Sequence, residues 1–132
     1  MLIVLDTNVI ISAILFGGIP RQVLELAIDK RVQPVTSPIL LSELSEILRK
    51  KFKFSPLMVK KIDTQIRKIH RIVEPDNEVK RARDPADNRV LEAAHFGTCD
   101  YIVTGDKDLL DIQTWHKIKI MTPAEFITIF QI

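Results

Sequence analysis

The feature that most constrains the fold is the apolar run Leu2–Leu5, which ends directly at an acid, Asp6. Four apolar residues without polar alternation are typical of a strand that is covered on both faces, as in a parallel sheet. The pattern returns at Tyr101–Val103, which is followed three residues later by Asp106. Since ligands bind at the carboxyl ends of strands in open α/β sheets, we expect these two carboxylates to meet at one sheet edge.

Strand and helix patterns alternate along the remainder of the chain, which predicts βαβ units and a mainly parallel sheet with helices on both faces. Further strands are expected at Val32–Thr36, Arg71–Glu74 and Ile118–Met121, and helices at Arg21–Lys30, Pro38–Lys51, Pro56–Arg71, Asp84–Gly97, Lys107–Asp111 and from Pro123 onward. Pro34 places its strand toward an edge of the sheet, because proline cannot donate to a neighbouring strand. A chain of 132 residues is expected to form a single domain, residues 1–132.

Apolar run lengths and cysteine content indicate the compartment. The longest apolar runs fall far short of the roughly 20 residues of a membrane span. The first residues lack the basic region and the cleavage site of a signal peptide. The lone cysteine, Cys99, can form no internal disulfide. Together these features predict a protein of the reducing cytoplasm that has no membrane contact.

The net charge of +2 hides an uneven distribution. Residues 49–83 hold twelve Lys/Arg and four Asp/Glu, which leaves seven and thirteen for the remainder of the chain. A basic segment joined to acidic ends suits a protein that attracts a polyanion to one surface and holds cations at another. A solvated, Lys-rich helical face explains the same basic residues equally well.

Four acids are candidates for one site: Asp6, Glu43, Asp87 and Asp106. Asp6 and Asp106 end strands, and Asp87 opens a helix on the side that its apolar stripe buries. Glu43 lies at the rim of an apolar helical stripe and joins the others if its helix crosses the same sheet edge. Carboxylates so close repel one another, and a divalent cation with oxygen ligands, Mg²⁺ or Mn²⁺, relieves that repulsion. Such a site can polarise a phosphodiester and activate a water molecule for attack.

Polar residues beside the acids have supporting roles in this interpretation. Thr7, Asn8 and Thr104 are placed to orient the carboxylates or the attacking water. Simpler explanations remain for single acids: turn chemistry accounts for Asp6 as well as a site does, and we assign Asp84 to capping a helix. Only the combination of the four acids indicates function.

Other chemistries have less support in the sequence. The three histidines and Cys99 lack the spacing of a zinc site, and Gly17-Gly18 lacks both the P-loop lysine and the dinucleotide-binding spacing. An aspartyl-phosphate mechanism needs a second acid two residues after Asp6, where Asn8 stands, or a phosphoacceptor partnered by a lysine after a later strand. We therefore rank that mechanism last.

Four motifs follow one another in a defined order: Leu5-Asp6-Thr7-Asn8, Ser37-Pro38 with Leu41-Ser42-Glu43-Leu44, Asp84-Pro85-Ala86-Asp87-Asn88, and Val103–Leu110. In this order they resemble the motifs of PIN-domain ribonucleases, and most of all the small single-domain VapC-type toxins of toxin–antitoxin pairs. The resemblance covers nearly the whole chain and includes the tail Met121–Phe126. Ala86 stands where a polar or acidic residue is expected, but it lies off the predicted metal face.

The resemblance implies a three-layer α/β/α sandwich in which the four acids named above cleave RNA with the help of a metal ion. Asp108 matches a further acid of many family members and is expected to be an accessory. A homodimer and an inhibitory antitoxin protein are also implied by the family.

The leading hypothesis is therefore a Mg²⁺- or Mn²⁺-dependent endoribonuclease of the cytoplasm. Asp6, Asp87 and Asp106 are expected to bind the metal, and Glu43 to bind it or to position the attacking water. The RNA backbone is expected to contact six basic residues, namely Arg49, Lys50, Lys51, Lys53, Arg81 and Arg83. The alternative hypothesis is a non-catalytic module of the same fold that binds RNA or protein.

Overall fold

The computed structural model describes residues 1–130, so the last two residues of the domain predicted over residues 1–132 lie outside the described residues. Its elements follow in the order β1 (Leu2–Leu5), α1 (Thr7–Leu15), α2 (Gly18–Ile28), β2 (Gln33–Thr36), α3 (Pro38–Lys50), α4 (Pro56–Ile69), β3 (Arg71–Ile72), α5 (Pro85–Phe96), β4 (Tyr101–Val103), α6 (Lys107–Ile112), β5 (Thr114–Trp115), β6 (Ile118–Met121) and α7 (Pro123–Phe130). The structure adds α1 and β5 to the elements that the sequence predicts.

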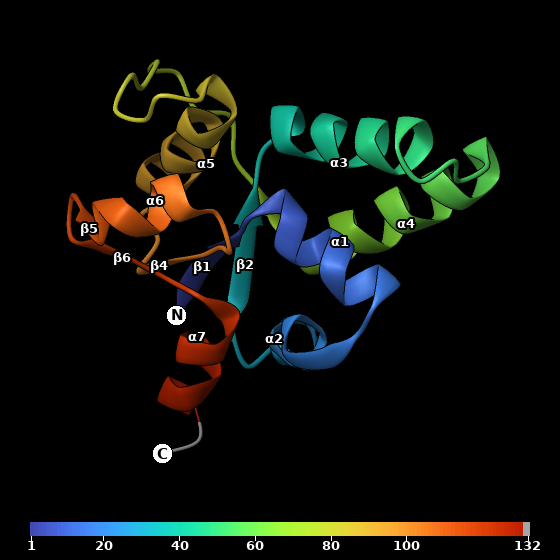
Figure 1. The fold of residues 1–132 in the computed structure, drawn as a ribbon, viewed down its shortest axis with the longest axis horizontal. Helices are drawn as coiled ribbons and strands as arrows, with labels where there is room; N and C mark the ends of the chain where they lie inside the picture. Colours follow the sequence, from blue (N-terminus) through green and yellow to red (C-terminus); the bar gives the residue numbers. More distant parts are fainter. Residues whose placement is uncertain (131–132) are drawn as a thin grey trace.

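The six strands form one sheet in the order β3-β2-β1-β4-β6-β5 (Figure 1). Neighbouring strands are parallel except β5, which runs antiparallel to β6. The predicted mainly parallel sheet is therefore confirmed. β1 and β4 are neighbours with Leu5 opposite Val103, so the chain leaves both strands at the same edge of the sheet.

The prediction that Pro34 places its strand toward the sheet edge was wrong, because β2 lies between β3 and β1. Gln33 donates its backbone N–H to Met1 on the β1 side at 2.9 Å, so the nitrogen of Pro34 faces the β3 side. There β3 pairs only with Val35 and Thr36. An interior strand accommodates the proline because its neighbour is too short to need that N–H.

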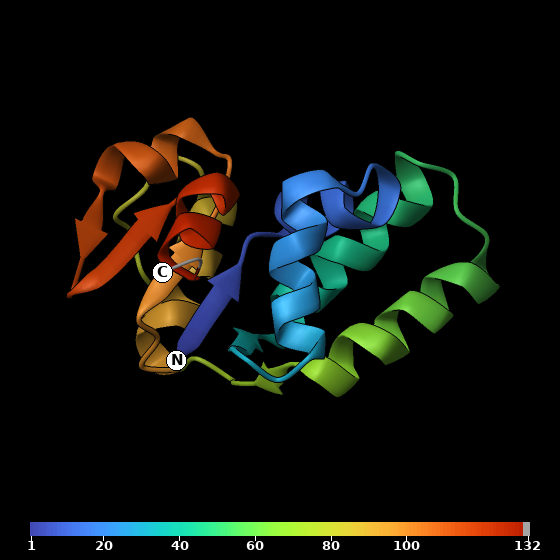
Figure 2. The same ribbon diagram turned by 90° about the horizontal axis from the view of Figure 1, so that it is seen from below.

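Apolar side chains pack on both faces of the sheet. Ile3 and Leu5 of β1 belong to a core formed with α1, α2, α3, α4 and α7. Val4 points to the opposite face, into a core formed mainly with α5 and α6. Figure 2 shows α3 and α4 as a pair of helices that extends beyond the sheet. The predicted three-layer α/β/α sandwich is confirmed.

Two of the helices that begin at the carboxyl edge of the sheet, α3 and α5, start at capping side chains. Ser37 Oγ accepts the backbone N–H of Leu40 at 3.4 Å at the start of α3. Asp84 Oδ1 accepts the N–H of Ala86 at 2.9 Å at the start of α5, which confirms its predicted capping role. Because serine and aspartate satisfy the free N–H groups of a first turn, these two starts were readable from the sequence.

Two glycines connect α1 to α2. Gly17 and Gly18 have φ angles of 73° and 65°, a left-handed conformation that glycine adopts without strain. Within the described residues, no single helix is long and apolar enough to cross a membrane. The pair α1 and α2 passes that test only together, and the chain bends by 104° between them.

Candidate active site

The two acids that end β1 and β4 are joined by one threonine. Thr104 is fully buried, donates its hydroxyl to Asp6 Oδ2 at 2.7 Å, and accepts the backbone N–H of Asp106 at 3.0 Å. Asp6 stands at the N-cap of α1, yet its carboxylate makes no capping hydrogen bond within the described residues. Helix capping therefore does not explain this buried acid.

Asp87 and Asp108 form a cluster with Asp106. One carboxylate oxygen from each of these three acids lies within 4.8 Å of the others. Asp87 is buried in the first turn of α5, and its Oδ2 has no hydrogen-bond partner among residues 1–130. Asp108 is half-buried in the first turn of α6, where its backbone N–H donates to Asp106 Oδ1 at 2.8 Å. A buried carboxylate oxygen without a partner is costly unless a cation or a proton neutralises it.

Burial and crowding raise the pKa of two of these acids. Burial is the main cause at Asp87, whose pKa rises from 3.8 to about 7, and a hydrogen bond with Asp106 and the charges of neighbouring acids add to the effect. Burial also raises the pKa of Asp6, and the charges of Glu43 and Asp106 act in the same direction, while the hydrogen bond from Thr104 partly opposes them. Without a cation, the cluster therefore holds a proton at pH values where a surface aspartate has none.

The four predicted acids have different positions in this arrangement. Asp87 and Asp106 share the cluster, Asp6 is joined to Asp106 through Thr104, and Glu43 is half-buried on α3, where its charge acts on Asp6. Of the two residues after Asp6, Thr7 is buried and Asn8 is exposed, both in the first turn of α1.

The six basic residues predicted to bind RNA fall into two groups. Arg81 and Arg83 line a hollow of about 250 Å³ together with Asp108, next to the acid cluster. The other four lie at or just beyond the end of α3, namely Arg49, Lys50, Lys51 and Lys53. α3 starts directly after β2, and its 13 residues carry its end about 20 Å from that start. The second group is therefore well separated from the sheet edge.

Two residues, Asp108 and Asn88, make contacts at or near the site that the sequence analysis did not assign to them. Asp108 was expected only as an accessory, but it lies in the three-acid cluster; its spacing of two from Asp106 at a helix start is the signal that places it there. Asn88 had no assigned role, although a buried asparagine inside a helix is disfavoured unless it makes a tertiary hydrogen bond. Its side chain bonds the backbone of Ala82.

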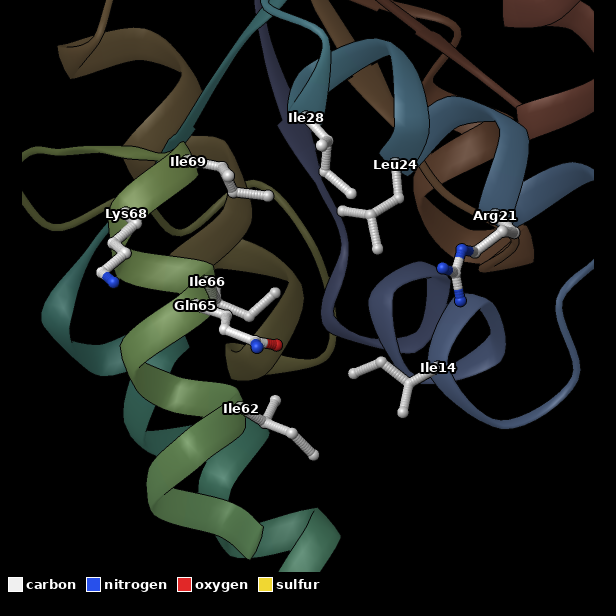
Figure 3. A pocket seen from close by; sticks show the side chains of 9 residues that line it. All are labelled: Ile14, Arg21, Leu24, Ile28, Ile62, Gln65, Ile66, Lys68 and Ile69. Atoms are coloured by element: carbon white, nitrogen blue, oxygen red, sulfur yellow. The ribbon is translucent and has the colours of Figure 1, made fainter.

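A larger hollow, of about 480 Å³, lies between α1, α2 and α4 (Figure 3). Its walls are mainly aliphatic: Ile14, Leu24, Ile28, Ile62, Ile66 and Ile69. Arg21, Lys68 and Gln65 complete the lining, which contains no acid among the described residues. The lining of this hollow, apolar and basic, therefore differs from that of the acid site.

The chain matches the PIN domain family over residues 2–108. It belongs to the PIN-domain family. The resemblance of its four motifs to this family is thereby confirmed. The matched range runs from β1 into α6 and contains all the acids of the site, namely Asp6, Glu43, Asp87, Asp106 and Asp108.

This PIN domain has similar proteins among both sequences and solved structures. It is 34% identical, over 143 residues, to the uncharacterized protein MJ1680 of Methanocaldococcus jannaschii, a match that covers 98% of this chain and 91% of the relative. A chain in the crystal structure of VapBC2 from Rickettsia felis, bound to a DNA fragment from their promoter, matches with a TM-score of 0.60 over 91% of this chain and 97% of that chain. The sequence identity of that pair is 16%, so the likeness concerns the fold.

The acids of this PIN domain suit a divalent metal ion. The donor set consists of carboxylate oxygens, the ligands that hard cations such as Mg²⁺ and Mn²⁺ prefer. Asp87 offers a buried oxygen that no group among residues 1–130 satisfies, and Asp106 and Asp108 lie within reach of the same point. The acid cluster can therefore bind a divalent cation.

Proposed function

We propose that this PIN domain is a Mg²⁺- or Mn²⁺-dependent endoribonuclease and acts as the toxin of a toxin–antitoxin pair. The main support is the buried Oδ2 of Asp87, which lacks a partner among residues 1–130 and lies close to the carboxylates of Asp106 and Asp108. When bound, a divalent cation supplies neutralisation of the acids, polarisation of the scissile phosphodiester and activation of the attacking water.

The chain's own side chains have separate tasks in this proposal. Asp6, Asp87 and Asp106 bind the cation, with Asp108 beside them, and Glu43 binds it or orients the water from α3. Thr104 holds Asp6 and the backbone of Asp106 in a constant relation, since its one hydroxyl bonds both. We expect single-stranded or looped RNA as the substrate, because bases must be splayed out before a protein can read them.

A cleavage assay on mixed RNA substrates, with and without Mn²⁺, tests the nuclease proposal. Cleavage by the unaltered protein should require the metal and should be abolished in Asp6→Asn, while the far-ultraviolet circular dichroism of that variant stays unchanged. Asp76→Asn is the matched control, because it makes the same chemical change at an exposed position in the loop before α5. Cleavage that persists in Asp6→Asn would refute the assignment of the acids.

Calorimetry separates the nuclease from its alternative. Binding of Mn²⁺ that is weakened in Asp87→Asn and Asp106→Asn supports the metal site. RNA or protein binding without Mn²⁺ binding and without cleavage would instead favour the non-catalytic module.

The antitoxin is proposed to occupy the aliphatic hollow between α1, α2 and α4 (Figure 3). Leu24 and Ile28 on α2 face Ile66 on α4 across it, and Arg21 and Lys68 provide its charged lining. Such a surface suits an amphipathic segment with aliphatic anchors and acidic flanks, which would dock as a helix in a groove. The fold is shared with a chain of the VapBC2 structure, which agrees with a partner protein. The homodimer and the cytoplasmic location stay predictions.

Growth of a bacterial host tests the toxin role. Expression of the unaltered chain should stop growth, Asp6→Asn should not, and co-expression of the product of an adjacent gene should restore it. Ile28→Asp places a charge at an exposed position of the hollow and should leave the toxicity intact while it prevents the rescue. Rescue that is equally efficient with Ile28→Asp would contradict docking at this hollow.

A further inference from the structure

The segment between β3 and α5 has no regular structure, yet α5 holds its backbone at two points. The buried side chain of Asn88 accepts the N–H of Ala82 at 2.7 Å and donates to the carbonyl of Ala82 at 3.1 Å. Glu92 accepts the N–H of Val79 at 2.8 Å, and its ion-pair partner Arg89 donates to the carbonyl of Val79 at 3.5 Å. Side chains of one helix thus replace the strand partner that this segment lacks.

This attachment fixes the backbone on both sides of Arg83 and therefore the point from which the Arg83 side chain extends. Ala82, the residue before it, is bonded by Asn88, and Asp84, the residue after it, caps α5. Arg83 is therefore held between two fixed residues at the start of the helix that carries Asp87. Its Nη2 lies 3.1 Å from Oδ1 of Asp108, a member of the acid cluster.

The ion pair between Arg83 and Asp108 contributes little to stability. The Arg83 side chain is 88% exposed and that of Asp108 is 41% exposed, and pairs so exposed are worth little because water and salt screen them. A guanidinium carries five N–H donors, and the contact with Asp108 uses one of its nitrogens, so further donors remain for another acceptor. The position of Arg83 beside the acids therefore needs another explanation than stability.

We propose that Arg83 binds the phosphate of the RNA at the acid cluster, and that Asn88 is the positioning residue that holds Arg83 there through the backbone of Ala82. The proposal rests on the proposed nuclease function and names a residue of the same site. Arginine binds phosphate oxygens in a two-pronged manner and stabilises the charge that develops on them during cleavage. The hollow of about 250 Å³ that Arg81, Arg83 and Asp108 line leaves space for part of a nucleotide beside the guanidinium.

Two measurements test the role of Arg83. In the cleavage assay, Arg83→Ala should lower kcat/KM by about 10²-fold, as the loss of one preorganised charge-stabilising group does. Arg83→Lys should restore only part of this loss, because lysine keeps the charge without the planar fork. In fluorescence anisotropy with a labelled single-stranded RNA and the Asp6→Asn protein, Arg83→Ala should reduce the slope of log affinity against log salt by about 0.7, the value for one phosphate contact.

Lys119→Ala is the matched control, since it removes one exposed positive charge on β6, at the edge of the sheet opposite to the acid site. Lys119 lies opposite Tyr101, the first residue of β4, and donates its backbone N–H to the backbone carbonyl of Asp100. The acid cluster lies beyond the other end of β4. Arg83→Ala that behaves like Lys119→Ala in both assays would overturn the proposal. Absence of cleavage by the unaltered protein would contradict the nuclease function, while the anisotropy comparison would still decide whether Arg83 contacts RNA.

A double-mutant cycle distinguishes positioning from a general structural role for Asn88. Asn88→Ala should lower kcat/KM by up to about 10²-fold in the unaltered protein, the effect of a misplaced group, and should add nothing in an Arg83→Ala background. If Asn88→Ala fails to fold, Asn88→Ser replaces it, because serine keeps a polar group at this buried position while its shorter side chain can no longer bond both backbone groups of Ala82. Losses that multiply in the double variant would show that Asn88 acts independently of Arg83 and would overturn its positioning role.

Discussion

Replacing Asp87 with asparagine should stabilise the metal-free protein although it damages the site. The fold raises the pKa of Asp87 from 3.8 to about 7, chiefly through burial and then through Asp106. A raised native pKa adds stability that is fully present below the unfolded value of 3.8 and is lost as the pH rises through about 7. A difference of about three pKa units corresponds to about 4 kcal/mol. Since Asp106 and Asp108 are only half-buried and solvent therefore screens part of this interaction, we expect Asp87→Asn to gain about 2 kcal/mol at about pH 8.

Urea unfolding followed by circular dichroism measures this gain. With a chelator present at about pH 8, the midpoint of Asp87→Asn should lie about 1 M or more above that of the unaltered protein. The advantage should shrink toward pH 4, where Asp87 is protonated in the native state. Manganese at a hundredfold excess over its dissociation constant should raise the unfolding free energy of the unaltered protein by about 2.7 kcal/mol and that of the variant by less.

An exposed aspartate, Asp76, provides the control for this prediction. Asp76→Asn, at an exposed position, should leave the unfolding free energy within about 0.5 kcal/mol of the original at every pH. If metal-free Asp87→Asn is less stable than the unaltered protein at about pH 8, the electrostatic account of the cluster is wrong, because repulsion and burial would then not dominate at this residue.

Three further substitutions test other parts of the structure. Burial lowers the pKa of His70 from 6.5 to about 4, so its contribution to stability is complete above pH 6.5 and falls by about 3 kcal/mol on acidification to pH 4; urea midpoints of His70→Gln should depend less on pH over this range. Thr104→Val removes the hydroxyl between Asp6 and Asp106 and should cost about 2 kcal/mol of unfolding free energy and most of the cleavage activity. Gly97→Ala would bring a Cβ within 2.9 Å of both the Ala93 carbonyl and Val35 Cγ1, and should lower the thermal midpoint by an amount equivalent to about 1–3 kcal/mol.

The parts of the fold that short-range chemistry decides were predictable from the sequence. Proline after a capping side chain located the starts of α3 and α5 at Pro38 and Pro85, because both the hydrogen bond and the φ angle are local properties. The place of β2 in the sheet was not predictable. It depends on β3, whose two residues, Arg71 and Ile72, are exposed and carry no apolar pattern.

The candidate site shows the same division between local and distant causes. The carboxyl ends of β1 and β4 brought Asp6 and Asp106 to one sheet edge, which the two apolar runs before them predicted. Asp108 was predicted only as an accessory, because a helix start two residues after Asp106 does not by itself show how closely the carboxylates of α5 and α6 approach each other. The attachment of the segment at Ala82 to Asn88 depends on how an irregular segment packs, for which the sequence holds no periodic signal.

The outermost strands restrict how this molecule can meet other proteins. β3 and β5, which border the sheet on its two sides, are each only two residues long. Strands so short leave few open N–H and C=O groups for a foreign strand to join, which guards the protein against edge-to-edge aggregation. A protein that binds this domain would therefore contact mainly side chains of the helical layers, and substitutions on those surfaces would change its binding specificity without altering the sheet.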